Sequence, residues 1–526
     1  MTAKVVVAET IADAGINALR ERFDVDVAIG LDAEELADRL ADAEGLIVRS
    51  ATRVDRALIE AAPRLRVIGR AGIGVDNIDL AAATERGVLV VNAPHANTIS
   101  AAEHAMALLL AQARNIPRAH GSLTSGKWER NSFEGIELHG KTIGIIGLGK
   151  IGTLVAQRCQ AFGLRVLAYD PFVGPDRARQ LGVELMELED LLPQVDFITI
   201  HLPKTKETEN LIGGENLLKV KPGVRIVNTS RGGIVNEADL AAAIEDGRVG
   251  GAGLDVFATE PITESPLFGL PQVVVTPHLG ASTAEAQDKA GTDVASAVAA
   301  ALGGELVLSA VNVDLGRDVA DEVKRYLPVA EQLGRAFVGL ARGLGDQIVV
   351  RAEGRIAQHG LRPLKLAVLK GLMEAVSTEP VSYVNAPSLA EDRGIALDLE
   401  STEQAVEYVS EVKISGEVAG RPVSVSGSLG RKGPMMVEIM GNDVELPLSE
   451  RMLIVRNEDV PGVIGRMATY LGEQGVNIAN MVVGRSRVTG EASLMGLNLD
   501  DPLDERQVET IRSLPGIQEA TYLDLS

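Results

Sequence analysis

The chain is poor in cysteine, in aromatic residues and in positive charge. Cys159 is the single cysteine among 526 residues, which excludes an intrachain disulfide and fits a reducing compartment. Aromatic residues make up 3%, so any core must consist of Ala, Val, Leu and Ile. The 51 basic residues are outnumbered by 73 acidic ones, and the formal net charge of −22 argues against nucleic acid and anionic membranes as partners. An anionic substrate would need a local group of arginines.

Long apolar runs and metal-ligand patterns are also missing. No run reaches membrane-spanning length, and the first residues read as a strand and not as a signal peptide, so we expect a cytoplasmic protein. The seven histidines and the cysteine show no metal-ligand spacing, and we predict no catalytic metal. Hydrophobic residues make up 46% of the chain, enough for several domains with large cores.

One glycine-rich turn predicts dinucleotide binding. It follows the apolar run 142–146 and precedes a helical pattern, a second apolar run and Asp170. Gly147 would permit the turn, Gly149 would let the backbone approach a pyrophosphate, and Gly152 would let helix and strand pack closely. The carboxylate of Asp170 can accept hydrogen bonds from ribose hydroxyls and would repel a 2′-phosphate, which favours NAD over NADP. The alternative is a tight turn without a ligand.

Apolar runs that alternate with helical patterns predict two doubly wound parallel-sheet α/β domains. The first is flavodoxin-like, and the second, a Rossmann domain, is inserted in it, with two crossings that form a hinge over a cleft. Beyond a break at Gly303-Gly304 we expect helices and then strands within 412–429, an α+β unit without a catalytic constellation. The last segment reads β-α-β-β-α-β, the ferredoxin-like order. The predicted domains are 1–98 with 281–305, 99–280, 315–447 and 450–526.

Three residues at predicted strand ends can act together in hydride transfer. Arg231, Glu260 and His278 each follow an apolar run that we interpret as a strand. Ligands of open α/β sheets bind outside the carboxyl ends of the strands. There a histidine can take the proton of a hydroxyl, a carboxylate can hold the imidazole, and an arginine can bind a substrate carboxylate. The alternative is that each is a surface residue.

The first 310 residues resemble the D-isomer-specific 2-hydroxyacid dehydrogenases. Besides the glycine turn, the resemblance rests on His201-Leu202-Pro203, Asn228-Thr229-Ser230-Arg231-Gly232-Gly233, Asp255-Val256-Phe257, Glu260-Pro261 and Pro277-His278-Leu279-Gly280. It implies NAD as cofactor and Arg231, Glu260 and His278 as catalytic residues. The candidate cofactor-binding residues are Gly147, Gly149, Lys150, Ile151, Gly152, Asp170, His201, Pro203, Thr229, Asp255 and Gly280.

Two strand ends of the first domain combine cationic side chains with turns rich in backbone N–H groups. This density suits a ligand with both a phosphate and a carboxylate, and it predicts a phosphorylated 2-hydroxy acid as substrate. The alternative is a solvated, charged loop. The candidate substrate-binding residues are Arg49, Ser50, Arg53, Gly72, Ile73, Gly74, Arg231 and His278.

The only tryptophan, Trp128, indicates an oligomer. The segment 126–130 resembles a loop that crosses a subunit interface in this family, where a basic residue reaches the neighbouring active site. The resemblance implies a homo-oligomer, either a tetramer or a dimer. The alternative is a core tryptophan of its own subunit.

The C-terminal segment resembles an ACT regulatory domain. The likeness rests on 457–465 and 475–478, and such modules bind amino acids at an interface between two copies. It implies L-serine as effector, bound by Asn457, Asp459, Gly462 and Asn477; the alternative is an ACT fold that binds no effector. The segment 318–447 resembles the intervening domain of long members of the family, and its ligand is not assigned.

Two other functions are compatible with parts of the sequence. A glyoxylate or hydroxypyruvate reductase would share the first 310 residues, and the ACT-like tail argues against it. An NAD-sensing scaffold would bind partners without turnover, and the presence of Arg231, Glu260 and His278 argues against that.

Overall fold

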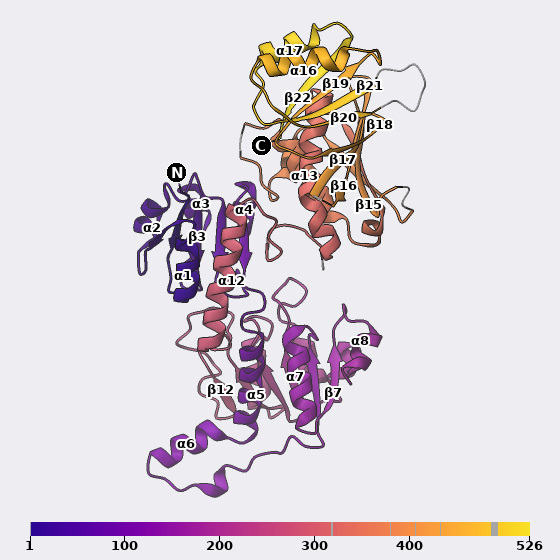
Figure 1. Cartoon of the computed structure of the whole chain (residues 1–526). Coiled ribbons are helices and arrows are strands. Elements are labelled where there is room, and N and C mark those ends of the chain that lie inside the picture. Colours follow the sequence, from indigo (N-terminus) through magenta and orange to yellow (C-terminus); the bar gives the residue numbers. More distant parts are fainter. Residues whose placement is uncertain are drawn as a thin grey trace.

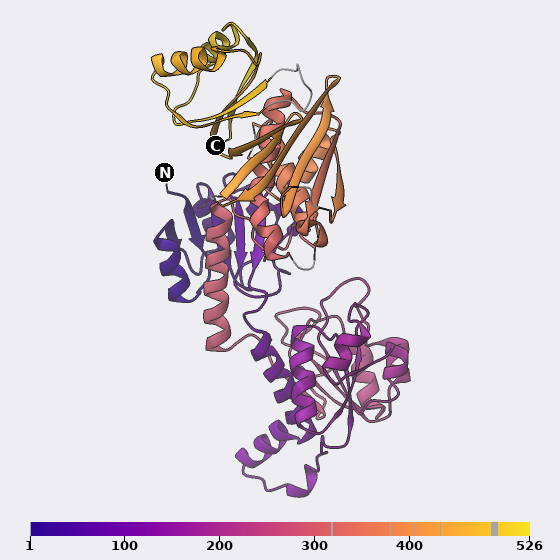
Figure 2. The ribbon, with the colours of Figure 1, turned by 45° about the vertical axis from the view of Figure 1, so that its right-hand side comes forward.

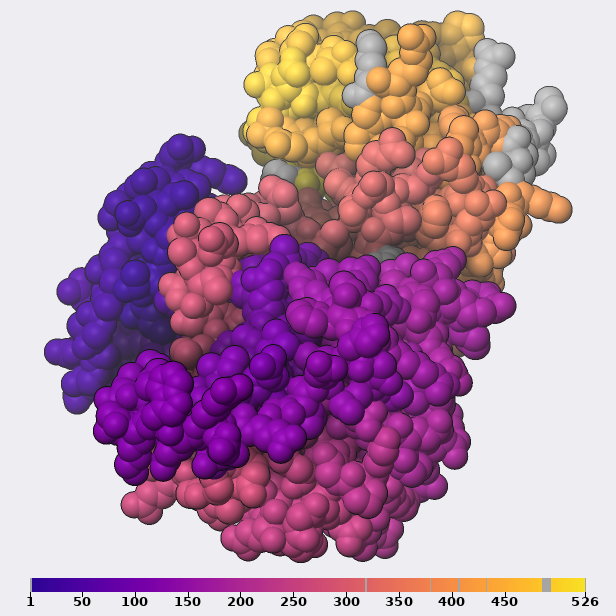
Figure 3. Space-filling view, turned by 90° about the horizontal axis from the view of Figure 1, so that it is seen from below, coloured from indigo at the N-terminus to yellow at the C-terminus, as the bar shows by residue number. Residues whose placement is uncertain are grey.

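The computed structural model describes residues 2–316, 319–378, 380–404, 407–431, 433–484 and 493–525. The second α/β domain lies at one end of the molecule and the C-terminal α+β unit at the other, with the N-terminal α/β domain and a third, α+β unit between them (Figures 1 and 2). Figure 3, which views the molecule from below, shows the second α/β domain covering most of that face, with the N-terminal domain in indigo beside it. Among the helices of the described residues, none is long and apolar enough to cross a membrane.

The N-terminal domain is built on a five-stranded parallel sheet of order β2-β1-β3-β4-β5. Its strands are β1 (Lys4–Val7), β2 (Asp24–Val27), β3 (Gly45–Val48), β4 (Val67–Arg70) and β5 (Leu89–Asn92). Its helices are α1 (Asp13–Arg20), α2 (Ala33–Leu40), α3 (Arg56–Glu60) and α4 (Leu80–Glu85). All four residues of β3 are buried, as expected for a strand covered on both faces.

The long helix α12 (Ala284–Leu302) returns the chain to this first sheet and covers one of its faces. A Cβ on Gly69 would lie 2.6 Å from Val298 Cγ2, and one on Gly15 would lie 2.6 Å from the carbonyl oxygen of Gly291, so these glycines permit close packing. The return of α12 confirms the predicted flavodoxin-like domain with an inserted Rossmann domain.

The inserted domain has a seven-stranded parallel sheet of order β12-β11-β10-β9-β6-β7-β8. Its strands are β6 (Thr142–Ile146), β7 (Arg165–Tyr169), β8 (Glu184–Leu185), β9 (Phe197–Ile200), β10 (Val224–Asn228), β11 (Val249–Leu254) and β12 (Val273–Val275). Its helices are α5 (Thr98–Ala113), α6 (Ile116–Thr124), α7 (Lys150–Ala161), α8 (Pro175–Gln180), α9 (Leu188–Leu191), α10 (Gly214–Lys219) and α11 (Glu237–Glu245). The strand order reverses at β6, which places a ligand crevice at the carboxyl ends of β6 and β9.

The third unit packs two long helices on one six-stranded sheet of order β14-β13-β15-β16-β17-β18. Its helices are α13 (Asp321–Ala341), α14 (Arg362–Glu374) and α15 (Ala386–Asp392), and its strands are β13 (Gln347–Gly354), β14 (Ala396–Thr402), β15 (Ser410–Val418), β16 (Arg421–Gly430), β17 (Gly433–Ile439) and β18 (Asn442–Pro447). The sequence predicts strands only within 412–429, so β13, β14, β17 and β18 were missed. The edge strand β14 is mostly exposed, and its apolar alternation is limited to Leu397 and Leu399.

The C-terminal unit has the predicted ferredoxin-like fold, with sheet order β20-β21-β19-β22. Its elements are β19 (Arg451–Asn457), α16 (Val463–Glu473), β20 (Ile478–Gly484), β21 (Ser493–Leu499), α17 (Glu505–Arg512) and β22 (Ile517–Asp524). The third unit packs directly against this sheet, since a Cβ on Gly496 would lie 2.6 Å from Leu446 Cδ2.

Candidate active site

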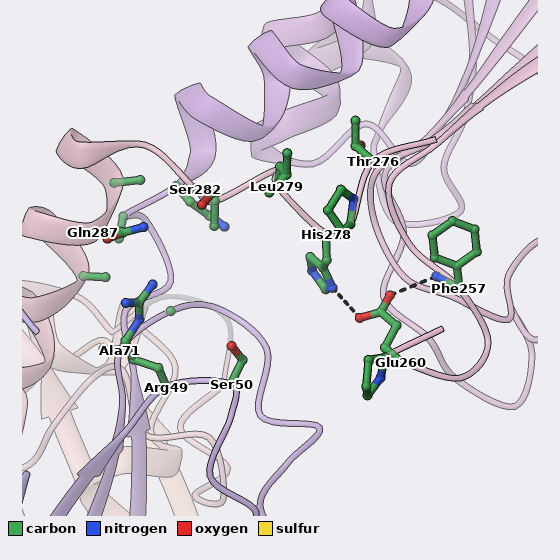
Figure 4. A pocket seen from close by; sticks show the side chains of 18 of the residues that line it. Arg49, Ser50, Ala71, Phe257, Glu260, Thr276, His278, Leu279, Ser282 and Gln287 are labelled. Atoms are coloured by element: carbon green, nitrogen blue, oxygen red, sulfur yellow. Dashed lines mark hydrogen bonds and ion pairs between the residues drawn. The ribbon is translucent and has the colours of Figure 1, made fainter. Parts of the chain in front are cut away.

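A cavity of about 600 Å³ lies between the two α/β domains. The N-terminal domain contributes Arg49, Ser50 and Gly72 from the carboxyl ends of β3 and β4, and the Rossmann domain contributes Glu260 and His278. Figure 4 shows Arg49 and Ser50 across the cavity from His278 and Glu260. The helix α12 forms a further wall (Figure 4), so both domains are needed to complete the cavity.

His278 and Glu260 form a hydrogen-bonded pair. His278 Nδ1 lies 2.6 Å from Glu260 Oε2, and the backbone N–H of Phe257 donates to Glu260 Oε1 at 2.9 Å. The hydrogen bond to Glu260 raises the pKa of His278 above its ordinary value. Burial alone would raise the pKa of Glu260, but the hydrogen bonds from His278 and Phe257 outweigh burial and lower it. The pair therefore favours an imidazole that can accept a proton beside a carboxylate that stays ionised.

The loop that carries His278 is held by a buried carboxylate. Asp255 Oδ1 accepts the hydroxyl of Thr276 at 2.5 Å and the N–H of Leu279 at 2.7 Å, and Asp255 Oδ2 accepts the N–H of Gly280 at 2.8 Å. His278 itself has a φ of 55°, in the left-handed region that a non-glycine residue rarely adopts. Asp255 thus fixes an unfavourable backbone conformation at the site.

Arg231 extends from the Rossmann domain to the turn after β4. Its Nε lies 3.3 Å from Asp76 Oδ2, and a Cβ on Gly74 would lie 2.4 Å from its Nη2. The guanidinium does not line the cavity but lies near enough to His278 for its charge to oppose the rise in the pKa of that histidine. The three predicted catalytic side chains therefore lie in one interdomain region, with Arg231 paired across the cleft.

A second arginine of the cavity, Arg70, was not among the predicted site residues. Arg70 is partly buried, and its Nε has no hydrogen-bond partner among the described residues. Burial, reinforced by the charge of Arg231, lowers the pKa of Arg70 to about 10, so the guanidinium stays charged near neutrality. A buried cation with an unused donor favours an anionic ligand. The signal in the sequence was its position, since Arg70 ends β4 as Arg49 follows the end of β3.

Besides Arg231, three predicted substrate residues lie outside the cavity. Ile73 and Gly74 are in the adjoining turn, and Arg53 lines a separate groove of about 900 Å³. The carboxylate of Glu9 accepts the backbone N–H groups of Arg49, Ala51 and Thr52 and so curls this loop around itself. That curl leaves Arg49 on the cavity and turns Arg53 away from it.

The glycine turn has the geometry that its sequence predicts. Gly147 has a φ of 97°, and a Cβ on it would lie 2.6 Å from the carbonyl oxygen of His201. A Cβ on Gly152 would lie 2.0 Å from the carbonyl oxygen of Gly147, whereas a Cβ on Gly149 would meet nothing within 4 Å. Gly152 therefore serves packing, and the space above Gly149 is open to a ligand at the N-terminus of α7.

The other predicted cofactor residues surround this turn. Asp170 Oδ2 accepts the N–H of Leu148 at 2.8 Å, which places the carboxylate beside the turn. Burial lowers the pKa of His201 to about 4, so this imidazole is neutral, and its Nε2 lies 3.0 Å from Thr199 Oγ1. The hydroxyl of Thr229 is buried without a partner among the described residues.

The remaining predicted cofactor residues are Lys150, Ile151, Pro203 and Gly280. Lys150 and Ile151 are the first two residues of α7, the carbonyl oxygen of Pro203 accepts the hydroxyl of Thr208, and Gly280 adjoins Asp255. An open glycine turn, an acid at the end of β7 and an orphaned buried hydroxyl together fit a dinucleotide such as NAD.

The predicted effector residues do not lie together in one chain. Asn457 is buried and ends β19 opposite Ser493, and Gly462, with a φ of 92°, is the N-cap of α16, so Asp459 lies in the turn between them. Asn477 lies at the other end of the sheet, where its Nδ2 donates to Asp500 at 2.5 Å. A site that uses all four residues therefore requires two copies of the unit.

Trp128 is 81% exposed, so the alternative of a core tryptophan is wrong. It follows α6, a helix without a single buried residue, on an arm that projects from the Rossmann domain (Figure 1). Cys159 is buried, and burial raises the pKa of its thiol to about 12. Within the described ranges no group of three or more His, Cys, Asp or Glu side chains is arranged to hold a metal ion.

Comparison with protein families gives three matches along the chain. The NAD binding domain of D-isomer specific 2-hydroxyacid dehydrogenases matches residues 106–280. The intervening domain of D-3-phosphoglycerate dehydrogenase matches residues 322–440, and the ACT domain matches residues 451–516.

Known proteins are similar over nearly the whole chain. A D-3-phosphoglycerate dehydrogenase of Mycobacterium tuberculosis is 49% identical over 95% of this chain and 96% of its own length. One of Synechocystis is 44% identical over 99% of this chain and 95% of its own length. Among solved structures, a protein of Thermus thermophilus is 35% identical, with a TM-score of 0.55 over 59% of this chain and 99% of its own. A glyoxylate reductase of Paecilomyes thermophila is 29% identical, with a TM-score of 0.55 over 59% of this chain and 98% of its own.

The solved structures cover 59% of this chain, whereas the sequence relatives cover nearly all of it, and the family matches include the two C-terminal units. The chain therefore belongs to the D-3-phosphoglycerate dehydrogenases, NAD-dependent oxidoreductases of the D-isomer-specific 2-hydroxyacid dehydrogenase family.

Proposed function

We propose that this enzyme oxidises 3-phospho-D-glycerate at C2 to 3-phosphohydroxypyruvate, the first step of L-serine biosynthesis, and that serine inhibits it. One observation carries the proposal: the His278–Glu260 pair faces a cavity whose opposite wall holds Arg49 and Arg70. Proton transfer and anion binding are thereby combined in one interdomain space.

His278 is the base in this proposal. Its Nδ1 is engaged by Glu260, so Nε2 receives the proton of the 2-hydroxyl group as the C2 hydrogen leaves with its electron pair. NAD, when bound, accepts that hydride. Glu260 stabilises the imidazolium that forms and fixes the ring, and Arg231 releases Asp76 to bind the substrate carboxylate and polarise the nascent carbonyl.

Arg49 and Arg70 bind the phosphate in this proposal. Both line the cavity on the side of the N-terminal domain, and the free Nε of Arg70 supplies a donor that no described residue uses. A dianionic phosphate between two guanidinium groups gains charge-assisted hydrogen bonds that a hydroxymethyl group would lack. The preference for a phosphorylated substrate separates this function from that of a glyoxylate or hydroxypyruvate reductase.

Serine binding is proposed at an interface between two ACT domains. The turn with Asp459 and Gly462 lies at one end of the sheet, and Asn477 lies at the other. A two-fold axis beside the sheet brings the opposite ends of two copies together. Asp459 of one copy would then hold the α-amino group, and Asn477 of the other would hold the side-chain hydroxyl.

The exposed arm is proposed to pack on a second subunit. Ile116 and Leu123 on α6 are 53% and 58% exposed and lie near Trp128 in the chain. Three large apolar side chains on one projecting segment are costly in water and typical of an obligate interface. We therefore propose a homo-oligomer, a dimer or a tetramer, that depends on this arm.

The reaction is tested by NADH formation from 3-phospho-D-glycerate. The wild-type enzyme should form NADH, and His278→Ala should lower kcat/KM about 10²- to 10⁴-fold, with NAD affinity nearly unchanged. Arg70→Gln should raise the KM for the phosphorylated acid about tenfold, with less effect on unphosphorylated D-glycerate. His359→Ala, which changes a histidine of the third unit, is the matched control. Equal rates on both acids in the wild type would contradict the proposal that the substrate is phosphorylated. NAD binding without NADH formation from either acid would indicate a scaffold and not an enzyme.

The pH dependence tests the His278–Glu260 pair. Since the bond to Glu260 raises the pKa of His278, Glu260→Gln should lower that pKa. Oxidation needs the neutral imidazole, so the acidic limb of kcat/KM against pH should move to lower pH, while the rate on the plateau falls. Proton NMR of the His278 ring should show the same change. Glu264→Gln, four residues away and exposed, should leave both profiles in place; an unmoved His278 pKa in Glu260→Gln would refute the assignment.

Serine sensitivity tests the effector site. Asp459→Ala and Asn477→Ala should each lose inhibition while the uninhibited rate is kept, and Glu473→Ala, an exposed acid at the end of α16, should respond as the wild type does. A mixed oligomer of Asp459→Ala and Asn477→Ala subunits should regain inhibition. Of the two equivalent sites at its ACT interface, one pairs an intact Asp459 with an intact Asn477. Failure of the mixed oligomer to respond would contradict a shared site.

The arm is tested by the mass of the particle in solution. Trp128→Asp should dissociate the oligomer, measured by light scattering after size exclusion, because a carboxylate would be buried without a partner. Leu218→Asp introduces the same charge at a site that is 65% exposed outside the arm and should leave the mass unchanged. An unchanged mass in Trp128→Asp would rule out the arm as the interface.

A further inference from the structure

Three basic side chains from three segments meet beside the glycine turn. Lys150 Nζ, on the first residue of α7, lies 2.8 Å from Nδ1 and 3.1 Å from Nε2 of His95. His95 belongs to the loop between β5 and α5, in the N-terminal domain. Lys289 Nζ, on α12, donates to the carbonyl oxygen of His95 at 3.4 Å. The contact therefore joins the Rossmann domain to the substrate domain.

This cluster has no counter-charge in the described part of the chain. Neither Lys150 nor Lys289 forms an ion pair with a described carboxylate, although acidic residues outnumber basic ones by 73 to 51. Two ammonium groups held at one residue, Lys150 at the ring of His95 and Lys289 at its carbonyl oxygen, repel each other unless an anion lies between them. The arrangement favours an anionic ligand at this point.

The N-terminus of α7 faces the same place. The helix begins at Lys150, and its N-cap, Gly149, provides no side-chain hydrogen bond, so the first N–H groups of the helix are left to a ligand. The open space above Gly149 adjoins them. The cofactor supplies an anion of the right kind, because the pyrophosphate of a dinucleotide binds at such a turn.

We propose that His95 and Lys289 of the substrate domain complete the pyrophosphate site begun by the glycine turn and Lys150. On binding, Lys150 exchanges the imidazole for a phosphate oxygen, and the His95 ring and the Lys289 ammonium bind the same anion from the opposite side of the cleft. Cofactor binding thereby draws the two domains together before the acid arrives. This inference rests on the NAD-dependent part of the proposed function and is independent of the acid that is oxidised.

The test measures binding without turnover. The affinities for NADH and for ADP-ribose are determined by fluorescence and calorimetry for the wild type, His95→Gln and Lys289→Gln. Each substitution should weaken both ligands about three- to tenfold, as expected for one partly solvated contact to a phosphate. The loss should grow as ionic strength falls, because the cluster is exposed. Arg20→Gln removes the same charge from the far end of α1 and should leave both affinities unchanged.

Domain closure supplies a second readout. X-ray scattering should show the wild type contracting when NADH is added, and the double variant His95→Gln/Lys289→Gln contracting less, with an unchanged melting temperature of the free proteins. Affinities equal to that of the wild type, or tighter binding after loss of His95, would overturn the inference. A wild type that binds NADH but oxidises no phosphorylated acid would refute the proposed substrate and leave this inference standing.

Discussion

The buried carboxylate of Asp255 is the interaction on which the active site depends. It accepts hydrogen bonds from Thr276, Leu279 and Gly280, the residues on either side of His278. His104 Nε2, on α5, lies 3.1 Å from Asp255 Oδ1. Burial alone would raise the pKa of Asp255, but the hydrogen bonds from His104 and Thr276 outweigh burial and keep it lowered. Without this carboxylate, two buried N–H groups would lose their acceptor and His278 would lose the support for its left-handed backbone.

Asp255 also lies next to the two segments that connect the domains. His104 belongs to α5, the first crossing between the domains, and Ser100 of this helix lies 2.8 Å from Thr283, where the second crossing begins. Both crossings are therefore held next to the loop that carries the base. A rotation of the N-terminal domain about this point would bring Arg49 and Arg70 toward His278 without disturbing the His278–Glu260 pair.

Local patterns allowed the chemistry to be predicted, and long-range packing explains what was missed. The roles of Gly147 and Gly152 follow from local geometry, since Gly147 has a φ of 97° and a Cβ on Gly152 would meet the carbonyl oxygen of Gly147 in the same turn. Arg53 was assigned to the substrate because it lies just beyond the strand end that carries Arg49, but the loop curls around Glu9, which is 40 residues away from Arg49 in the chain. Arg70 was missed because its burial and its unpaired Nε depend on packing that the sequence does not show. The edge strand β14 was missed because its apolar alternation spans only Leu397 and Leu399, too short a period to mark a strand.

The third unit contacts both the ACT domain and the N-terminal domain. Arg335 on α13 donates to the carbonyl oxygen of Leu525 at the end of the ACT domain and to Glu331, which also accepts the hydroxyl of Tyr383 at 2.9 Å. The neighbouring Ser382 donates to the carbonyl oxygen of Gly87, at the start of the segment that forms β5. These polar contacts connect the ACT domain to the strand that leads into the loop of His95.

A chain of contacts between the ACT domain and the substrate domain is not by itself a means of regulation. An effector changes the rate only if it binds two arrangements of the domains with different affinity. A hinge at α5 and α12 would provide two such arrangements, an open and a closed cleft that differ in the distance between the walls that carry the arginines and the His278–Glu260 pair. The largely buried ion pair of Arg335 and Glu331 resists separation of its two side chains, because each charge needs its partner. If an effector shifts the ACT domain, the contacts of Arg335 and Ser382 would carry that shift toward β5 as a movement of the whole unit, which a hinge could convert into opening or closure.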